Sequence, residues 1–270
     1  LGDLVDHLRQ KKQLNMEDYD AISGISGIFN YCILSPDIFE ENIKKILEYI
    51  IHISQEKKVG GLTVPGWYLP VSSFVTERDK ELWPEGYVNL GVSHGISALL
   101  MVLCNAKRVG ITIDGQDETI KRIADFLLQY KIVENEHIYW GTHVSLTELL
   151  KGEVTNTNTR DAWCYGTPGT AYALLLAGKV TDNKVYVDQA IRGMTFAVNR
   201  LLDIYSPTFC HGLSGVAYIS YRFFEETNMS FFNDKALDLV EEIESQYDEN
   251  HPVGFKNIES KGDEGSYDHV

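Results

Sequence analysis

The chain has 270 residues, with 24 basic and 39 acidic side chains that give a formal net charge of −15 and a pI near 4.9. Hydrophobic residues make up 44%, which is enough for a sizeable core and too many for a disordered chain. The negative charge disfavours a nucleic-acid partner, and no apolar run reaches the roughly 18 residues of a membrane span.

The start of the chain and its cysteines set the context. The first residue is Leu1, inside a predicted helix, with neither an initiator Met nor a signal peptide, so we expect a trimmed piece of a longer protein. Four cysteines without a Cys-x-x-Cys pair do not form a disulfide framework and fit a reducing, cytoplasmic compartment. Cys32 and Cys104 lie in apolar runs and are expected to be core thiols, whereas Cys164 and Cys210 lie beside glycines and polar or aromatic residues.

A glycine-containing motif precedes a strongly apolar segment four times along the chain. The segments that follow include residues 96–104, 170–177 and 216–224. A helix that is apolar on every side is a buried one, and glycine at its start lets neighbouring backbones approach closely. We therefore expect four inner helices, which begin at the second glycine of each motif and are 68, 74 and 46 residues apart: Gly27, Gly95, Gly169 and Gly215.

Amphipathic segments alternate with these apolar ones. Apolar residues recur at helical spacing over 38–50, 120–128 and 187–201, and a last stripe is formed around Leu237, Val240 and Ile243. The alternation is typical of a degenerate helix-pair repeat. It predicts an all-α fold, a double α/α ring (toroid) in which outer amphipathic helices wrap an inner ring of buried helices.

Two irregular inserts interrupt the repeat, near residues 59–90 and 132–160. The first is rich in Gly and Pro, and the second contains a short aromatic run and a polar tract, so we expect loop with some strand at the mouth of the ring. We find no linker that would divide the chain. Residues 1–270 are therefore expected to form one partial toroid domain, and residues 261–266 a loop leading into a helix that the chain lacks.

Two cysteines and a histidine precede inner helices at equivalent points of the repeat: Cys164, Cys210 and His211. Equivalent helix starts in a ring point to the same central mouth. Two Cys and one His form a zinc-ligand set that leaves the fourth position open; the alternative is two core cysteines and a capping histidine. His94 occupies the same repeat position, where it is either an acid/base residue beside a metal or a helix-capping residue.

Three segments resemble the signatures of the lanthionine synthetase C-like proteins, the lantibiotic cyclases. They are Gly-Val-Ser-His-Gly at 91–95, Arg-Asp-Ala-Trp-Cys-Tyr-Gly at 160–166 and Cys-His-Gly at 210–212. The resemblance covers residues 19–215 and implies a double ring of seven inner and seven outer helices. Only four glycine-type helix starts are found, so we expect repeats to be missing at both ends.

The resemblance implies a zinc-dependent peptide cyclase. Cys164, Cys210 and His211 match the family's zinc ligands. The family reaction adds a peptide cysteine to dehydroalanine or dehydrobutyrine and forms a (methyl)lanthionine thioether ring. Zinc (Zn2+) would supply the thiolate, because a free thiol with a pKa of about 8.5 is mostly protonated at neutral pH.

The resemblance also implies catalytic roles for four further residues. His94 matches the catalytic histidine, which would protonate the enolate formed by the attack, and Asp20 matches an acidic residue that would orient His94. Arg160 and Tyr165 match residues that line the active site and would stabilise the enolate oxygen. For Asp20 and Arg160, the alternative is a solvated surface charge.

The implied substrate is a dehydrated precursor peptide. A dehydratase and an export transporter are implied partners, and the implied location is the cytoplasm, with peripheral membrane association through those partners. Two other classes of function stay open. Other double-ring helical proteins hydrolyse glycosides with paired carboxylates and need no Cys-Cys-His set, and a relative that keeps zinc could bind glutathione or a partner protein without cyclase activity.

Overall fold

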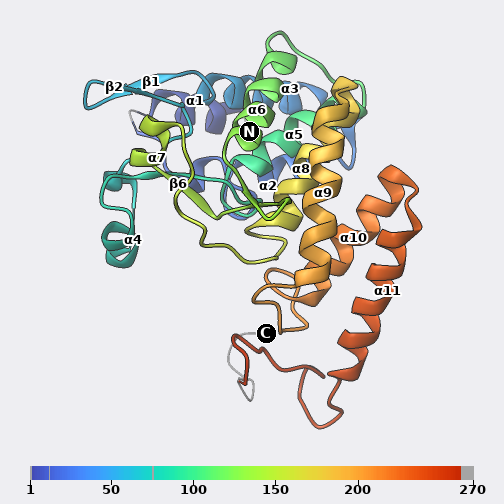
Figure 1. Ribbon diagram of the computed structural model, residues 1–270. Coiled ribbons are helices and arrows are strands. Elements are labelled where there is room, and N and C mark those ends of the chain that lie inside the picture. Colours follow the sequence, from blue (N-terminus) through green and yellow to red (C-terminus); the bar gives the residue numbers. More distant parts are fainter. Residues whose placement is uncertain (1, 12, 75, 263–270) are drawn as a thin grey trace.

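The computed structural model describes residues 2–11, 13–74 and 76–262, and it is mostly helical, as predicted (Figure 1). The α-helices are α1 (Gly2–Gln10), α2 (Ile25–Cys32), α3 (Pro36–Ile53), α4 (Glu77–Leu82), α5 (Ile96–Arg108), α6 (Gln116–Gln129), α7 (Leu146–Lys151), α8 (Thr167–Thr181), α9 (Lys184–Arg200), α10 (Leu213–Thr227) and α11 (Ser230–Ser245). Among the described residues, none of the helices combines the length and apolarity needed to cross a membrane.

The inner helices lie side by side in chain order, α2 against α5, α5 against α8 and α8 against α10. Helix α8 is buried from Thr167 to Gly178, all but its last turn, because α5, α6, α9 and α10 all pack against it. The prediction of complete burial is confirmed for α8 and is wrong for α10, where Tyr218 and Tyr221 are each 46% exposed. The difference follows from position, since α8 lies between the inner helices α5 and α10, whereas α10 has an inner helix on one side among the described residues.

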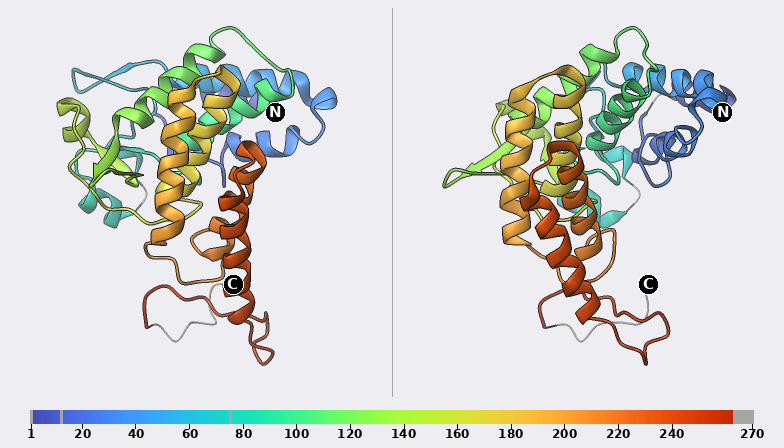
Figure 2. Two further views of the ribbon diagram at one scale, coloured as in Figure 1. Left: turned by 45° about the vertical axis from the view of Figure 1, so that its right-hand side comes forward. Right: turned by 90° about the vertical axis from the view of Figure 1, so that its right-hand side faces the viewer.

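Each inner helix is backed by an outer one: α3 packs on α2, α6 on α5, α9 on α8 and α11 on α10 (Figure 2). Helix α6 buries the predicted stripe. In α11 the predicted stripe is wrong, because Leu237 and Val240 are 55% and 42% exposed while Phe232, Ala236 and Leu239 are buried. Both stripes have helical spacing, and only the position of α10 decides which of them is covered.

Of the four glycines predicted to begin inner helices, Gly95 is confirmed and the other three are wrong by three residues. The N-cap residues of α2, α5, α8 and α10 are Gly24, Gly95, Gly166 and Gly212. Gly95 is therefore equivalent to Gly24 and Gly166, each 71 residues away. The other predicted glycines, Gly27, Gly169 and Gly215, lie in the first turn of their helices. The first-turn glycines are required because the preceding loop packs against them: a Cβ at Gly169 would lie 2.2 Å from the carbonyl oxygen of Trp163.

The two inserts contain short strands, as expected. The hairpin partners are β1 (Lys57–Val59) with β2 (Leu62–Val64), and β4 (Lys131–Glu134) with β5 (His137–Trp140). Strand β3 (Tyr87–Asn89) of the first insert pairs antiparallel with β6 (His143–Ser145) of the second, which places Asn89 opposite His143. This pair joins the two inserts next to the start of α5.

Two further predictions concern particular segments. Cys32 and Cys104 are core thiols, with exposed fractions of 3% and 0%. The loop predicted for residues 261–266 lies outside the described residues from residue 263 onward.

Candidate active site

Backbone hydrogen bonds join the loops that precede the four inner helices. The N–H of Ala21 donates to the carbonyl of Ser93 (2.9 Å), that of Val92 to Cys164 (2.9 Å), and that of Cys164 to Cys210 (3.1 Å). The loops are therefore held edge to edge. The side chains directly before the N-cap glycines of α5, α8 and α10 belong to His94, Tyr165 and His211, so these residues lie around one mouth.

The predicted metal ligands lie together at this mouth. One ligand atom from each of Cys164, Cys210 and His211 lies within 4.8 Å of the others. Cys164 is buried, Cys210 is exposed and His211 is half-buried, so the group is open to solvent on the Cys210 side. The alternative of two core cysteines is wrong for Cys210. Two sulfurs and an imidazole nitrogen at this spacing fit a zinc ion with one open position.

The two thiols are electrostatically unequal. The hydrogen bond from the Cys164 thiol to Cys210, together with burial, raises the pKa of Cys164 well above its usual range. The same hydrogen bond, with a second one from His211, lowers the pKa of Cys210 to about 5. The pair therefore favours the thiolate on Cys210, and the thiolate is the form that binds metals.

Asp20 lies directly beside His94, as the resemblance implied. His94 Nδ1 is 2.6 Å from one carboxylate oxygen of Asp20, and the other oxygen accepts the backbone N–H groups of Ile22, Ser23 and Gly24 at 2.6–3.1 Å. Burial raises the pKa of this carboxyl, but the hydrogen bonds outweigh it and leave the pKa below the usual value. The alternative of a solvated surface charge is wrong for Asp20, which is fully buried.

Tyr165 lies near His94, and Arg160 is close enough to Cys164 to affect its thiol electrostatically. The Tyr165 hydroxyl accepts a hydrogen bond from Asn89 Nδ2 (3.1 Å), and its ring centroid is 6.3 Å from that of His94. Arg160 donates from Nη2 to the carbonyl of Asp203 (3.1 Å), and its positive charge opposes the rise in the pKa of Cys164. Its buried Nε–H has no hydrogen-bond partner among the described residues.

Asp161 anchors the loop that carries Cys164, a role that the motif alone did not reveal. Its buried carboxylate accepts hydrogen bonds from Nε (2.8 Å) and Nη2 (2.7 Å) of Arg200 and from the backbone N–H of Leu202 (2.8 Å). Gly166 closes the same loop with φ +85°, and a Cβ there would lie 1.7 Å from the carbonyl oxygen of Arg160. Only glycine fits this conformation, so the loop is fixed at both ends.

Three polar residues near the mouth were missed by the sequence reasoning: Asn89, Asn257 and Glu259. Asn89 lies in β3 and holds the Tyr165 hydroxyl, and Glu259 Oε1 lies 3.2 Å from His211 Nε2. No motif marks these residues, because each reaches the site only through a contact between distant parts of the chain.

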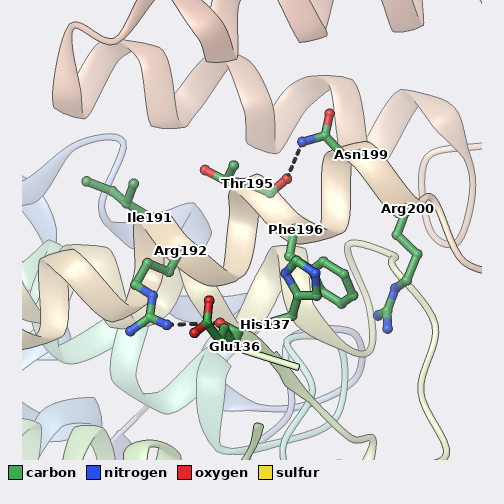
Figure 3. Close-up of a pocket in the computed structure, with 8 residues that line it drawn as sticks. All are labelled: Glu136, His137, Ile191, Arg192, Thr195, Phe196, Asn199 and Arg200. Carbon is green, nitrogen blue, oxygen red and sulfur yellow. Dashed lines mark hydrogen bonds between the residues drawn. The ribbon is translucent and has the colours of Figure 1, made fainter. Parts of the chain in front are cut away.

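A cavity of about 510 Å³ lies away from the mouth, between the β4–β5 turn and α9 (Figure 3). His137 stacks on Phe196 there with ring centroids 4.3 Å apart, and Arg192 donates to the carbonyl of Glu136 (2.9 Å). None of the predicted site residues lines it. Its link to the site is Arg200, which lines the cavity and also pairs with Asp161.

The fold and the clustered side chains define a helical α/α ring protein with a Cys-Cys-His group suited to a metal. The chain belongs to the lanthionine synthetase C-like family, whose model, "Lanthionine synthetase C-like protein", matches residues 2–269. The prediction of this family and of its toroid fold is confirmed.

Individual relatives agree with this assignment. "Nisin biosynthesis protein NisC" of Lactococcus lactis subsp. lactis is 28% identical over 244 residues, which cover 88% of this chain and 57% of that protein. The solved structure of "Nisin cyclase" matches with a TM-score of 0.84 and 25% identity, covering 96% of this chain and 64% of the other. The chain thus spans about three fifths of the length of these two proteins.

A solved D-mannose isomerase also matches, with a TM-score of 0.54, 12% identity, and coverage of 94% of this chain and 61% of that one. At this identity the match shows the shared helical fold alone. The helical ring is therefore compatible with unrelated chemistry, and the function has to be argued from the site.

Proposed function

We propose that this chain carries the active site of a lantibiotic cyclase, which joins a peptide cysteine to dehydroalanine or dehydrobutyrine through a thioether bond. The observation that supports it is the convergence, at one mouth, of the Cys164–Cys210–His211 group and the His94–Asp20 pair. The addition needs a thiolate nucleophile and a proton donor. The first group is suited to provide the thiolate and the second to provide the proton.

The Cys164–Cys210–His211 group would activate the thiol. These three residues would hold a zinc ion, which when bound keeps a substrate sulfur deprotonated at neutral pH. Cys164 is buried behind the group and Cys210 is exposed in front of it, so the peptide sulfur would approach from the Cys210 side.

His94 would complete the addition. As the sulfur bonds to the β-carbon, the double-bond electrons move toward the carbonyl oxygen and form an enolate, whose α-carbon must then gain a proton. Asp20 binds Nδ1 of His94, so Nε2 is the atom that would deliver this proton. The Asp20 carboxylate also stabilises the protonated ring that the transfer requires.

Arg160 and Tyr165 would stabilise the enolate oxygen. Arg160 has a buried Nε–H without a hydrogen-bond partner among the described residues. The Tyr165 hydroxyl, held by Asn89, still has its own proton to donate. Donors fixed in advance at the position of developing charge are an effective form of catalysis.

The proposal extends to the setting of the reaction. The substrate would be a dehydrated precursor peptide, and a dehydratase and an export transporter would be partners of the complete protein. We also propose a cytoplasmic location, with peripheral association at the membrane through those partners. All four cysteines are free, which fits a reducing compartment.

The test is cyclisation of a dehydrated peptide that contains one cysteine, by the full-length protein loaded with zinc. Ring formation leaves the peptide mass unchanged and removes the free thiol, so mass spectrometry after thiol alkylation measures it. We expect loss of the alkylated product with the wild type and with Cys104→Ala, a substitution in the core away from the site. A zinc-loaded protein that binds the peptide and leaves its thiol free would overturn the proposal in favour of a non-catalytic zinc-containing binding protein.

A further inference from the structure

The segment that follows α11 returns to the site. It runs back beneath the loop between α9 and α10 (Figures 1 and 2). Gln246 Nε2 donates to the carbonyl of Tyr205 (3.3 Å), and Ser206 Oγ donates to Asn257 Oδ1 (3.0 Å). These contacts attach the segment to the same loop that leads into Cys210 and His211.

At the end of this segment a carboxylate meets His211. Glu259 Oε1 lies 3.2 Å from His211 Nε2 and accepts a hydrogen bond of 2.6 Å from Asn257 Nδ2. Asn257 is 3% exposed, whereas the Glu259 side chain is 53% exposed. The buried amide therefore orients the half-exposed carboxylate toward His211.

The orientation of Asn257 is itself determined. Its Oδ1 accepts the Ser206 hydroxyl, so its Nδ2 must face Glu259. The carbonyl of Ser206 in turn accepts the N–H of Leu213, the first residue of α10. A continuous series of hydrogen bonds thus runs from the helix start beside His211, through Ser206 and Asn257, to the carboxylate on the His211 ring.

We propose that Glu259 is a positioning residue for His211, held in place by Asn257, and that it directs Nδ1 of His211 toward the metal. A neutral imidazole carries its proton on one nitrogen and offers the other as a ligand. The carboxylate on Nε2 keeps the proton there and leaves Nδ1 for the ion. The inference deepens the proposed function, since it assumes that the Cys-Cys-His group binds zinc.

A simple surface ion pair does not account for this arrangement. Exposed pairs of this kind contribute little to stability, and they need no buried amide behind the carboxylate. Carboxylates or carbonyls that accept the second N–H of a metal-bound histidine are a general feature of metal sites, and their removal lowers metal affinity by about 10–100-fold.

The first test measures zinc affinity of the full-length protein by competition with a chromogenic chelator. Glu259→Ala should weaken zinc binding by about 10–100-fold, and Glu259→Gln, which keeps an acceptor and loses the charge, should weaken it less. Asn257→Ala should act in the same direction. The matched control is Glu249→Ala, which removes an exposed carboxylate from the same segment and should leave the affinity unchanged.

The second test identifies the ligating nitrogen of His211. Nitrogen NMR of the zinc-loaded, imidazole-labelled protein should show Nδ1 bound to the metal and a proton on Nε2. Zinc on Nε2, or an affinity that Glu259→Ala leaves at the wild-type value, would overturn the inference while the cyclase proposal survives. A wild-type protein that binds no zinc would overturn both.

Discussion

The two halves of the mouth are constructed differently. The His94–Asp20 half depends on the buried carboxylate of Asp20. One of its oxygens contacts the His94 ring, and the other accepts hydrogen bonds from three backbone N–H groups two to four residues further along the chain. Among the described residues, the half formed by Cys164, Cys210 and His211 has no comparable local anchor. Its loops are fixed by contacts with the end of α9 and with the segment that follows α11.

This difference separates proton transfer from metal binding. Changes in the first half should affect proton transfer and leave the metal ligands in place, because Asp20 and His94 share no side-chain anchor with them in the part of the chain that the structure describes. Changes in the second half should affect metal binding, loop order and catalysis together. Four predictions use this contrast, beginning with the largest expected effect.

Cys210→Ala should abolish stoichiometric zinc binding and reduce cyclisation to the uncatalysed rate, since two protein ligands remain where three were available. Elemental analysis and thiol alkylation on the same preparation measure both quantities. Cys104→Ala is the matched control, because this thiol is in the core, and it should keep the metal. Full zinc occupancy in Cys210→Ala would contradict the assigned ligand set.

His94→Asn should keep its zinc and cyclise about 10²–10⁴-fold more slowly, the usual cost of losing a proton-transfer group. Protonation from the wrong face of the enolate would also give mixed stereochemistry, which chiral analysis of the product detects. If His94→Asn loses zinc as readily as Cys210→Ala, His94 is a metal ligand and the contrast between the halves fails.

Asp161→Ala should destabilise the protein by about 3–5 kcal/mol, because it leaves the guanidinium of Arg200 without its buried partner. It should also weaken zinc binding, since the loop that carries Cys164 loses its anchor. Urea unfolding and chelator competition measure the two effects. Asp188→Ala, at an exposed position of α9, should change the stability by less than about 0.5 kcal/mol; an equal effect of both substitutions would argue against the anchor.

Asp20→Asn should destabilise the protein by about 1–3 kcal/mol at neutral pH, the range for hydrogen bonds to a charged group. Hydrogen bonds hold the pKa of Asp20 in the folded state below its usual value, so its stabilising contribution is present above the unfolded pKa and is lost as the pH falls through the folded pKa. Urea unfolding at about pH 7, 5 and 3 should therefore show a shrinking difference between wild type and variant. A difference that is independent of pH would show that the carboxylate charge is not responsible.

Several features followed from the sequence alone. The three short motifs placed Cys164, Cys210, His211 and His94 at equivalent helix starts, and the structure brings them to one mouth. Their roles as zinc ligands and acid/base residue remain predictions. The stripe of α6 could be predicted because it is unambiguous, whereas α11 carries two possible stripes and only its contact with α10 selects one.

By itself, the sequence determined the class of fold, the family and the chemical groups of the site, because hydrophobic period and short motifs are local properties of the chain. The tertiary structure decided which contacts fix those groups. Asp161 is anchored by Arg200, Tyr165 by Asn89, and His211 by Glu259. These partners are separated by 39 to 76 residues, and no local pattern specifies a hydrogen bond that exists only after the helices have packed.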